Sequence, residues 1–232
     1  MALAGREGLG VERVNRREEQ RQQTYARIVD AAVGLLIDNG YAATSALGVQ
    51  ERAGISRGAL LHHFPTSEDL FAAAVQRLVE MNIEAIRDEL AKADEDLDPV
   101  ARGVQVLYHA SQRRSFATEL ELWAAARADV WLRQALLPHE RAAAAHLRQV
   151  MDELFGPLVT GESGYPALVD ITVHFLRGVT VSASLGSKGH DAIVDSWIAV
   201  MRQTLDCAAV KQTSSPTRRK RPSTKTVRGH SR

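Results

Sequence analysis

Residues 44–64, TSALGVQERAGISRGALLHHF, have the pattern of two short helices joined by a turn. Thr44 and Ser45 carry hydroxyl groups that can cap the start of the first helix, which is expected to end at Ala53. Gly54 follows at once and can adopt the left-handed backbone that stops a helix. The first half of the stretch therefore predicts a helix closed by a glycine turn.

The second half of the stretch opens on another capping residue, Ser56, and predicts a helix over 57–63. A short helix, a glycine turn and a second capped helix form a helix-turn-helix, a motif whose second helix enters the major groove of DNA. The candidate DNA-contacting residues are Thr44, Ser45, Ser56, Arg57, Gly58, Ala59, Leu61, His62 and His63.

Helical patterns flank this motif on both sides. Apolar residues at helical spacing predict a helix over 24–39, and Gly40 is expected to end it with a left-handed backbone. After the motif, 67–69 (Ser-Glu-Asp) opens a long helix that is expected to run to about Ala93. The motif therefore lies within a bundle of helices.

The residues that carry a family resemblance lie between about 21 and 75, roughly a quarter of the chain. They are Gly40-Tyr41, Thr44-Ser45, Ala53-Gly54-Ile55-Ser56, Gly58, Leu60, His63-Phe64 and Glu68-Asp69-Leu70. In this order and spacing they resemble the DNA-binding domain of the tetracycline-repressor (TetR) family. The resemblance implies a homodimer that binds palindromic operator DNA and responds to a small-molecule effector, most often as a repressor.

Three positions depart from the family pattern. Leu61 and Ser67 stand where the family commonly has a phosphate-binding tyrosine and a lysine, and Val49-Gln50 replaces an Ile-Ala pair. The first two changes remove phosphate-binding groups, so other cations must supply affinity. Arg17, Arg21, Arg27, Arg52 and Arg57 are the candidates in this region.

The remainder of the chain shows helical patterns and no alternating strand pattern. We expect helices over 99–108, 116–128, 130–136, 138–155, 166–185 and 191–210, with a loop around 156–164. The predicted fold class is all-α: a three-helix helix-turn-helix domain followed by a helical ligand-binding and dimerisation domain. The expected divisions are a flexible arm (1–20), the DNA-binding domain (21–66), the helical domain (67–210) and a disordered tail (211–232).

Charge is distributed unevenly along the chain. The tail over 211–232 holds eight basic residues and no acidic residue, which leaves 21 basic against 28 acidic residues elsewhere. The tail is either a solvated extension or a nonspecific DNA-binding arm. The second reading keeps open an alternative function, a nonspecific nucleoid-type DNA-binding protein.

The last two predicted helices are apolar on more than one face, so one face can cover the core while the other meets a partner. Pairing with the same helices of a second copy would give a four-helix dimer interface, as in the family. A buried hairpin within a monomer is the alternative. The candidate interface residues are Phe175, Ser182, Trp197 and Met201.

The middle helices are expected to hold the effector, because ligand sites between helices are apolar with a few polar anchors. The candidate ligand-binding residues are His109, Phe116, Glu119, Trp123, His174 and Arg177, with Tyr108, Trp131 and His146 as further possibilities. Arg177 favours an anionic ligand of moderate size. Each residue has an alternative role in core packing.

Other classes of function find no support in the sequence. It contains no H-E-x-x-H, G-x-S-x-G or complete P-loop motif, and 62–63 (His-His) cannot ligate one metal, because neighbouring helical side chains diverge. We therefore expect no enzyme activity, cofactor or metal. No apolar run reaches ~18 residues and no signal peptide is seen. The single Cys207 allows no internal disulfide, so a cytoplasmic protein is expected.

Overall fold

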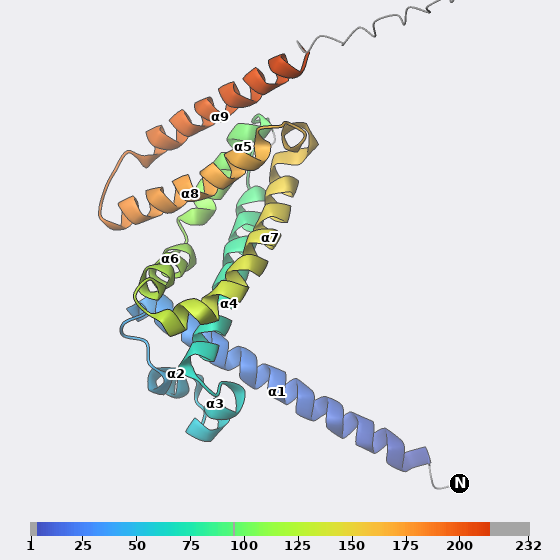
Figure 1. The fold of residues 1–232 in the computed structure, drawn as a ribbon. Helices are drawn as coiled ribbons and strands as arrows, with labels where there is room; N and C mark the ends of the chain where they lie inside the picture. Colours follow the sequence, from blue (N-terminus) through green and yellow to red (C-terminus); the bar gives the residue numbers. More distant parts are fainter. Residues whose placement is uncertain (1–3, 95, 214–232) are drawn as a thin grey trace, which may run out of the picture.

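The structure is a computed structural model that describes residues 4–94 and 96–213, with side chains for all of these except 4–15, 142 and 206–213. Within these ranges it contains nine helices and no strand (Figure 1), which confirms the predicted all-α class. The helices are α1 (Ala4–Asn39), α2 (Ala46–Ala53), α3 (Arg57–His63), α4 (Ser67–Leu90), α5 (Pro99–Ser111), α6 (Arg114–Ala126), α7 (Val130–Thr160), α8 (Tyr165–Ser184) and α9 (His190–Thr213).

Helix α1 begins well before Thr24, where the sequence predicted its start. Residues 4–20, expected to form a flexible arm, continue the same helix and run away from the rest of the molecule (Figure 1). This segment has no apolar stripe that could signal a helix. It is rich in Glu and Arg, which extend an existing helix at little cost once it has been nucleated.

The buried side chains form two hydrophobic cores. The head core joins α1, α2 and α3 to the first half of α4, and the body core joins the second half of α4 to α5, α7, α8 and α9. The head core also takes Leu122 and Ala126 from α6 and Leu132 and Leu136 from α7. The head is therefore packed against helices that lie beyond residue 66 in the sequence.

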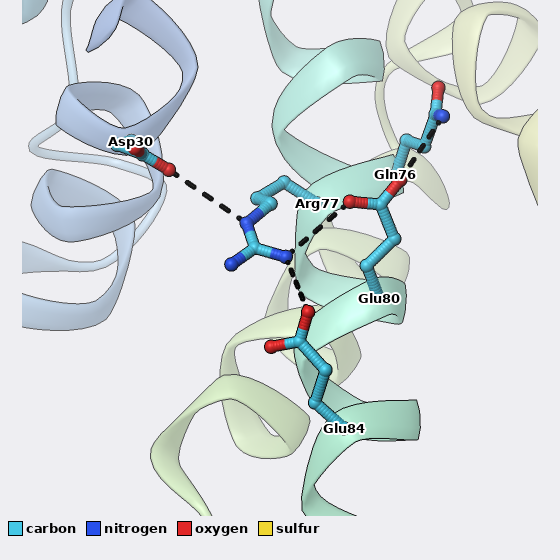
Figure 2. A network of polar contacts seen from close by, with 5 residues as sticks. All are labelled: Asp30, Gln76, Arg77, Glu80 and Glu84. Carbon is cyan, nitrogen blue, oxygen red and sulfur yellow. Dashed lines mark hydrogen bonds and ion pairs between the residues drawn. The ribbon is translucent and has the colours of Figure 1, made fainter. Parts of the chain in front are cut away.

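Helix α4 connects the two cores and is capped at its N-terminus. Its N-cap is Thr66, whose hydroxyl accepts a hydrogen bond from the Asp69 N–H (3.1 Å) in a capping box. Figure 2 shows Arg77 in its middle, which contacts Asp30 of α1 (3.8 Å) as well as Glu80 (3.4 Å) and Glu84 (3.0 Å). Exposed ion pairs of this kind contribute about 0–1 kcal/mol each, so the packed α1–α4 surface holds the helices together and Arg77 only orients them.

Helix α7 differs from its predicted form. The sequence predicted a short helix over 130–136 and a second helix from Pro138, but one helix runs through this proline. Leu132 and Leu136 pack into the head core and Met151 and Leu154 into the body core. This packing on both sides outweighs the one backbone hydrogen bond that Pro138 removes. The true break is at Gly156, with φ 72° and ψ 172°.

Helices α8 and α9 form the last layer, with α9 lying against α5 and α8 (Figure 1). Val194, Ile198, Met201 and Leu205 recur at helical spacing and are buried in the body core. Ile193 and Val200 lie on the opposite side and are 49% and 48% exposed. The structure thus confirms that α9 has two apolar faces, and one of them is uncovered in the single chain.

Gly40 ends α1 with φ +76°, as the sequence predicted, and Gly54 ends α2 with φ +63°. A β-carbon at Gly40 would lie 2.7 Å from Glu121 Oε1, whereas one at Gly54 would meet nothing within 4 Å. Gly54→Ala should therefore lower the free energy of unfolding by about 1 kcal/mol, and Gly40→Ala by clearly more, because only the latter also displaces Glu121. Urea denaturation of both variants measures the difference. Equal losses would show that Glu121 moves aside without cost.

Candidate functional site

The helix-turn-helix is held by three local backbone contacts. The Ser45 hydroxyl accepts a hydrogen bond from the Gly48 N–H (3.1 Å), and the Ser56 hydroxyl accepts one from the Ala59 N–H (3.2 Å). Between them, the left-handed Gly54 turns the chain and donates its N–H back to α2. The predicted bounds of both helices and all three turn residues are confirmed.

One face of α3 is exposed and the other is anchored. Leu60 and, just after the helix, Phe64 are buried in the head core. Arg57, Gly58, Leu61 and His62 are exposed, Ala59 and His63 are half-buried, and Ser45 and Ser56 are exposed at the caps of α2 and α3. Among the described side chains, Arg57 has no hydrogen-bond or ion-pair partner. On this exposed face, Arg57 is a cation without a partner among the described side chains, and the residues around it are mostly small.

Thr44 and His63, which were predicted to contact DNA, are at least partly buried and contact other parts of the head. Thr44 is buried and its hydroxyl donates to the Gly40 carbonyl at 2.8 Å, so it fixes the turn before α2. The His63 ring lies 6.3 Å from the ring of Tyr25, and burial lowers the pKa of His63 below its usual value. His63 therefore stays neutral at pH 7 and adds no positive charge to this face.

The surrounding arginines are not equally free to meet a phosphate. Arg52 is paired with Asp38 (2.9 Å), and Arg21 lies 3.7 Å from Glu18. Arg17 and Arg27 are exposed and have no partner among the side chains that the structure describes. Together with Arg57, these two make the unpaired basic set of the head.

Helix α6 is attached directly to the end of α1. Glu121 Oε1 accepts a hydrogen bond from the Tyr41 N–H at 2.7 Å. Arg114, at the start of α6, donates to the Ile37 carbonyl and lies 3.5 Å from Asp38. These contacts join α6 to the segment that leads from α1 into the helix-turn-helix.

A cavity of about 210 Å³ lies between α4, α5, α6, α7 and α8. Most of its lining is apolar and comes from α4, α5, α7 and α8, with Phe116 from α6. The polar groups on its wall are Asn82, Ser111, Glu119, Glu140, Arg148, Asp170, His174 and Arg177. This composition, an apolar wall with a few polar anchors, is that of a small-molecule site.

The charged groups of the cavity are held in two sets of contacts, one around Glu119 and one around Trp123. Asn82 donates to Glu119 Oε2 at 2.5 Å and accepts from the Ser115 hydroxyl at 2.7 Å. The Trp123 indole N–H donates to Glu140, and the Arg177 guanidinium lies 4.0 Å from the centre of the Trp123 ring. These side chains come from α4, α6, α7 and α8, which the cavity therefore couples.

Burial and the nearby Glu140 carboxylate raise the pKa of Glu119 from 4.5 to about 7. Burial also raises the pKa of Glu140, although the Trp123 N–H and Arg177 oppose this shift. Burial lowers the pKa of Arg177, and the two carboxylates oppose that shift. Perturbed carboxyl groups inside a cavity are typical of functional sites.

The structure brings four of the six predicted ligand-binding residues to the cavity wall: Phe116, Glu119, His174 and Arg177. Trp123 lies behind Arg177 and Glu140, outside the wall itself. His109 is exposed elsewhere, as are Trp131 and His146, while the Tyr108 hydroxyl donates to Asp191 at 2.9 Å. The sequence missed Asn82 and Glu140. Asn82 could have been found from the sequence, because it is a polar residue within an apolar stripe formed by Val79, Ile83 and Ile86.

The predicted interface residues on α8 and α9 are placed unequally. Met201 is fully buried in the body core and cannot meet a partner. Trp197 is half-buried against Phe175 (ring centres 5.7 Å apart) and donates to the Thr172 hydroxyl at 3.0 Å. Ser182 is half-buried. The exposed apolar side chains of this layer are Ile171, Val181, Leu185, Ile193 and Val200.

Comparison with known proteins agrees with this architecture. A family model for bacterial regulatory proteins of the tetR family matches residues 28–74. The HTH-type transcriptional regulator CymR of Pseudomonas putida is 32% identical over 142 residues, which are 61% of this chain and 68% of CymR. The chain belongs to the TetR family of transcriptional regulators. An uncharacterized HTH-type regulator of Mycobacterium tuberculosis, Rv2912c, is 27% identical over 164 residues, 71% of this chain and 84% of that protein.

Solved structures of TetR regulators share the fold of this chain at low sequence identity. The multidrug binding protein EbrR complexed with ethidium matches with a TM-score of 0.58 and 23% identity over 78% of this chain and 98% of EbrR. A TetR regulator of Haloarcula marismortui matches with a TM-score of 0.59 and 17% identity over 81% of this chain and 98% of its own.

Two further findings concern other classes of site. Among the described residues, no group of three or more His, Cys, Asp or Glu side chains could hold a metal ion. In the same part of the chain, no helix is long and apolar enough to span a membrane. The side chain of Cys207 and the tail over 214–232 lie outside what the structure describes.

The raised pKa of Glu119 predicts a specific dependence of stability on pH. The folded protein keeps the Glu119 proton up to about pH 7, whereas the unfolded chain loses it near pH 4.5. Glu119 therefore contributes stability below pH 4.5, and this contribution is lost as the pH rises to about 7. In Glu119→Gln, urea denaturation should show a smaller loss of stability over this interval. Glu153→Gln, on the exposed surface of α7, should keep the loss of the unmodified protein, and parallel profiles for all three proteins would contradict the assignment.

Proposed function

We propose that this TetR regulator is a homodimeric, cytoplasmic repressor that binds palindromic operator DNA and releases it when a small molecule enters the cavity. The observation that carries the proposal is the double attachment of α6. Glu119 and Phe116 line the cavity, while Arg114 and Glu121 of the same helix contact the end of α1. One rigid element thus touches both the candidate effector site and the DNA-binding head.

The exposed face of α3 supports the DNA-binding half of the proposal. The face is anchored by buried residues on its other side, and Arg57 lies unpaired in its first turn. In a dimer, two such helices would reach successive major grooves at a half-site separation of about 34–36 Å or a multiple of it. Palindromic operators then follow from the two-fold symmetry of the protein.

The geometry of α6 supports the effector-responsive half. Residues 119 and 121 are two positions apart, and side chains at this spacing point to roughly opposite sides of a helix, at about 100° per residue. A ligand that shifts α6 at Glu119 also moves Glu121 relative to the Tyr41 N–H. An effector that prefers one position of α6 would shift the population of dimers toward a spacing of heads that does not fit DNA.

Selection of bound fragments from the protein's own genome, followed by footprinting, tests the function as a whole. A specific regulator protects discrete palindromic sites, and protection is lost when the effector is added. Uniform protection along the DNA would instead show the nonspecific nucleoid-type function that the basic tail left open.

Arg57 should contribute to sequence readout. Arginine near the start of a recognition helix can contact guanine O6 and N7 together, so Arg57→Ala should weaken each half-site by about 1–3 kcal/mol and relax one base position. Arg87→Ala, an exposed arginine at the far end of α4, is the matched control and should leave binding unchanged. Binding-site selection on both variants measures the effect. Uniform weakening with an unchanged preferred sequence would show that Arg57 contacts only phosphate.

The uncovered apolar face of α8 and α9 should form the dimer interface. Val200 on α9 is 48% exposed and Val130 at the start of α7 is 49% exposed, so they offer a matched pair. Val200→Glu would bury an unpaired charge twice across a symmetric interface and should give monomers that do not bind operator DNA. Val130→Glu should stay dimeric. Analytical ultracentrifugation compares the two, and an intact Val200→Glu dimer would place the interface elsewhere.

A further inference from the structure

The charges on the cavity wall do not balance. Arg148 is paired with Asp170 at 2.7 Å, so these two cancel. Glu119, Glu140 and Arg177 remain, and among the described residues neither carboxylate is joined to Arg177 by an ion pair within 4 Å. With both glutamates ionised, the wall carries one uncompensated negative charge in a largely apolar space.

Glu119 has bonding capacity directed to the cavity that the protein does not use. Its Oε2 accepts from Asn82, and the described residues supply no partner for its Oε1. Arg177 is held by the Trp123 ring at 4.0 Å, which keeps its guanidinium stacked instead of paired with either glutamate. A buried carboxylate with an open oxygen is costly unless a donor satisfies it.

We propose that the cavity binds a small organic monocation, whose ammonium or amidinium group pairs with Glu119 and Glu140 and whose apolar body packs against the wall. In the sequence, Arg177 predicted an anionic ligand, because no local pattern places it beside Glu140, which lies on another helix. The inference rests on the proposed function only in treating this cavity as the effector site.

The size of the cavity limits the apolar body. Its volume is about 210 Å³, and an apolar cavity of about 150 Å³ accommodates benzene. The ligand therefore has the size of one aromatic ring with a short polar substituent. An amidinium matches a carboxylate through two parallel hydrogen bonds, which are stronger than bonds between neutral groups.

Binding of a cation is coupled to loss of a proton. The pKa of Glu119 is raised to about 7, so near pH 6.5 most of the protein carries this proton. The groups facing it are Asn82 from α4, Ser111 from α5, Glu140 and Arg148 from α7, and Asp170, His174 and Arg177 from α8. Pairing of Glu119 with a cation lowers its pKa and releases the proton to solvent.

Three probes of one shape test the charge of the ligand: benzamidine, benzamide and benzoate, which are cationic, neutral and anionic at pH 8. They share a phenyl ring and a planar head group of the same size. Calorimetric titration of the full-length protein without DNA should show benzamidine binding about tenfold or more tightly than benzamide, with benzoate weakest. At pH 6.5, titrations in phosphate and in ACES, two buffers without net positive charge that differ in ionisation heat, should differ in heat, because the proton released by the protein is taken up by the buffer.

Substitutions of the charged groups should change the affinity for a cation and the affinity for an anion in opposite directions. Glu119→Gln and Glu140→Gln should each weaken benzamidine by about tenfold, and Glu119→Gln should abolish the proton release. Arg177→Gln should strengthen benzamidine and would weaken an anion. Glu153→Gln, which makes the same charge change on the surface of α7, is the control and should bind like the unmodified protein.

The outcomes separate this inference from the proposed function. Benzoate as the tightest probe, equal affinity for all three, or no binding of any probe at millimolar concentration would overturn the cation assignment. Cation binding that leaves operator binding unchanged would support the assignment of ligand class and contradict the proposed release mechanism instead.

Discussion

The hydrogen bond from the Tyr41 N–H to Glu121 joins the segment that enters the helix-turn-helix to α6, one of the helices that line the cavity. Glycine at position 40 permits the approach, because a β-carbon there would lie 2.7 Å from the carboxylate. Arg114 makes a second attachment about two turns earlier on α6, at the Ile37 carbonyl. Each contact is exposed and contributes on the order of 1 kcal/mol. They fix where α1 ends relative to α6, and this position sets the direction in which α3 faces.

Helix α4 makes the head and the body one mechanical unit. Its first half packs in the head core and its second half in the body core, where Ile83 and Ile86 also reach the cavity wall. A packed core resists continuous deformation, so a change at the cavity must appear as a discrete shift of whole helices. Helix α6 is attached to the head at the end of α1. Helices α4 and α6 therefore provide two direct connections between the cavity and the DNA-binding head.

The sequence predicted the helix-turn-helix in detail because its determinants are local. Ser45, Gly54 and Ser56 act on backbone groups within three or four residues, so spacing alone specifies them. The cavity is different, because Asn82, Glu119, Glu140 and Arg177 come from four helices and no local pattern states that they meet. His109 and Trp131 show the converse error, since ligand-like residue types prove exposed when the fold places them. The prediction that a new helix begins at Pro138 was wrong for the same reason. The leucines before Pro138 pack into a core formed by distant parts of the chain, and this packing decides whether the helix continues.

The two cavity carboxylates are hard to explain as structural residues. Burial raises the pKa of both groups, and the Glu140 carboxylate raises that of Glu119 further. Apolar side chains of similar size would fill the same positions without desolvating a charge, so the protein is less stable than its fold allows. Arg177 relieves only part of this cost, because the Trp123 ring holds it away from direct pairing. Glu119 lies on the same helix as Glu121, so a group that neutralises Glu119 acts directly on the element that contacts the end of α1.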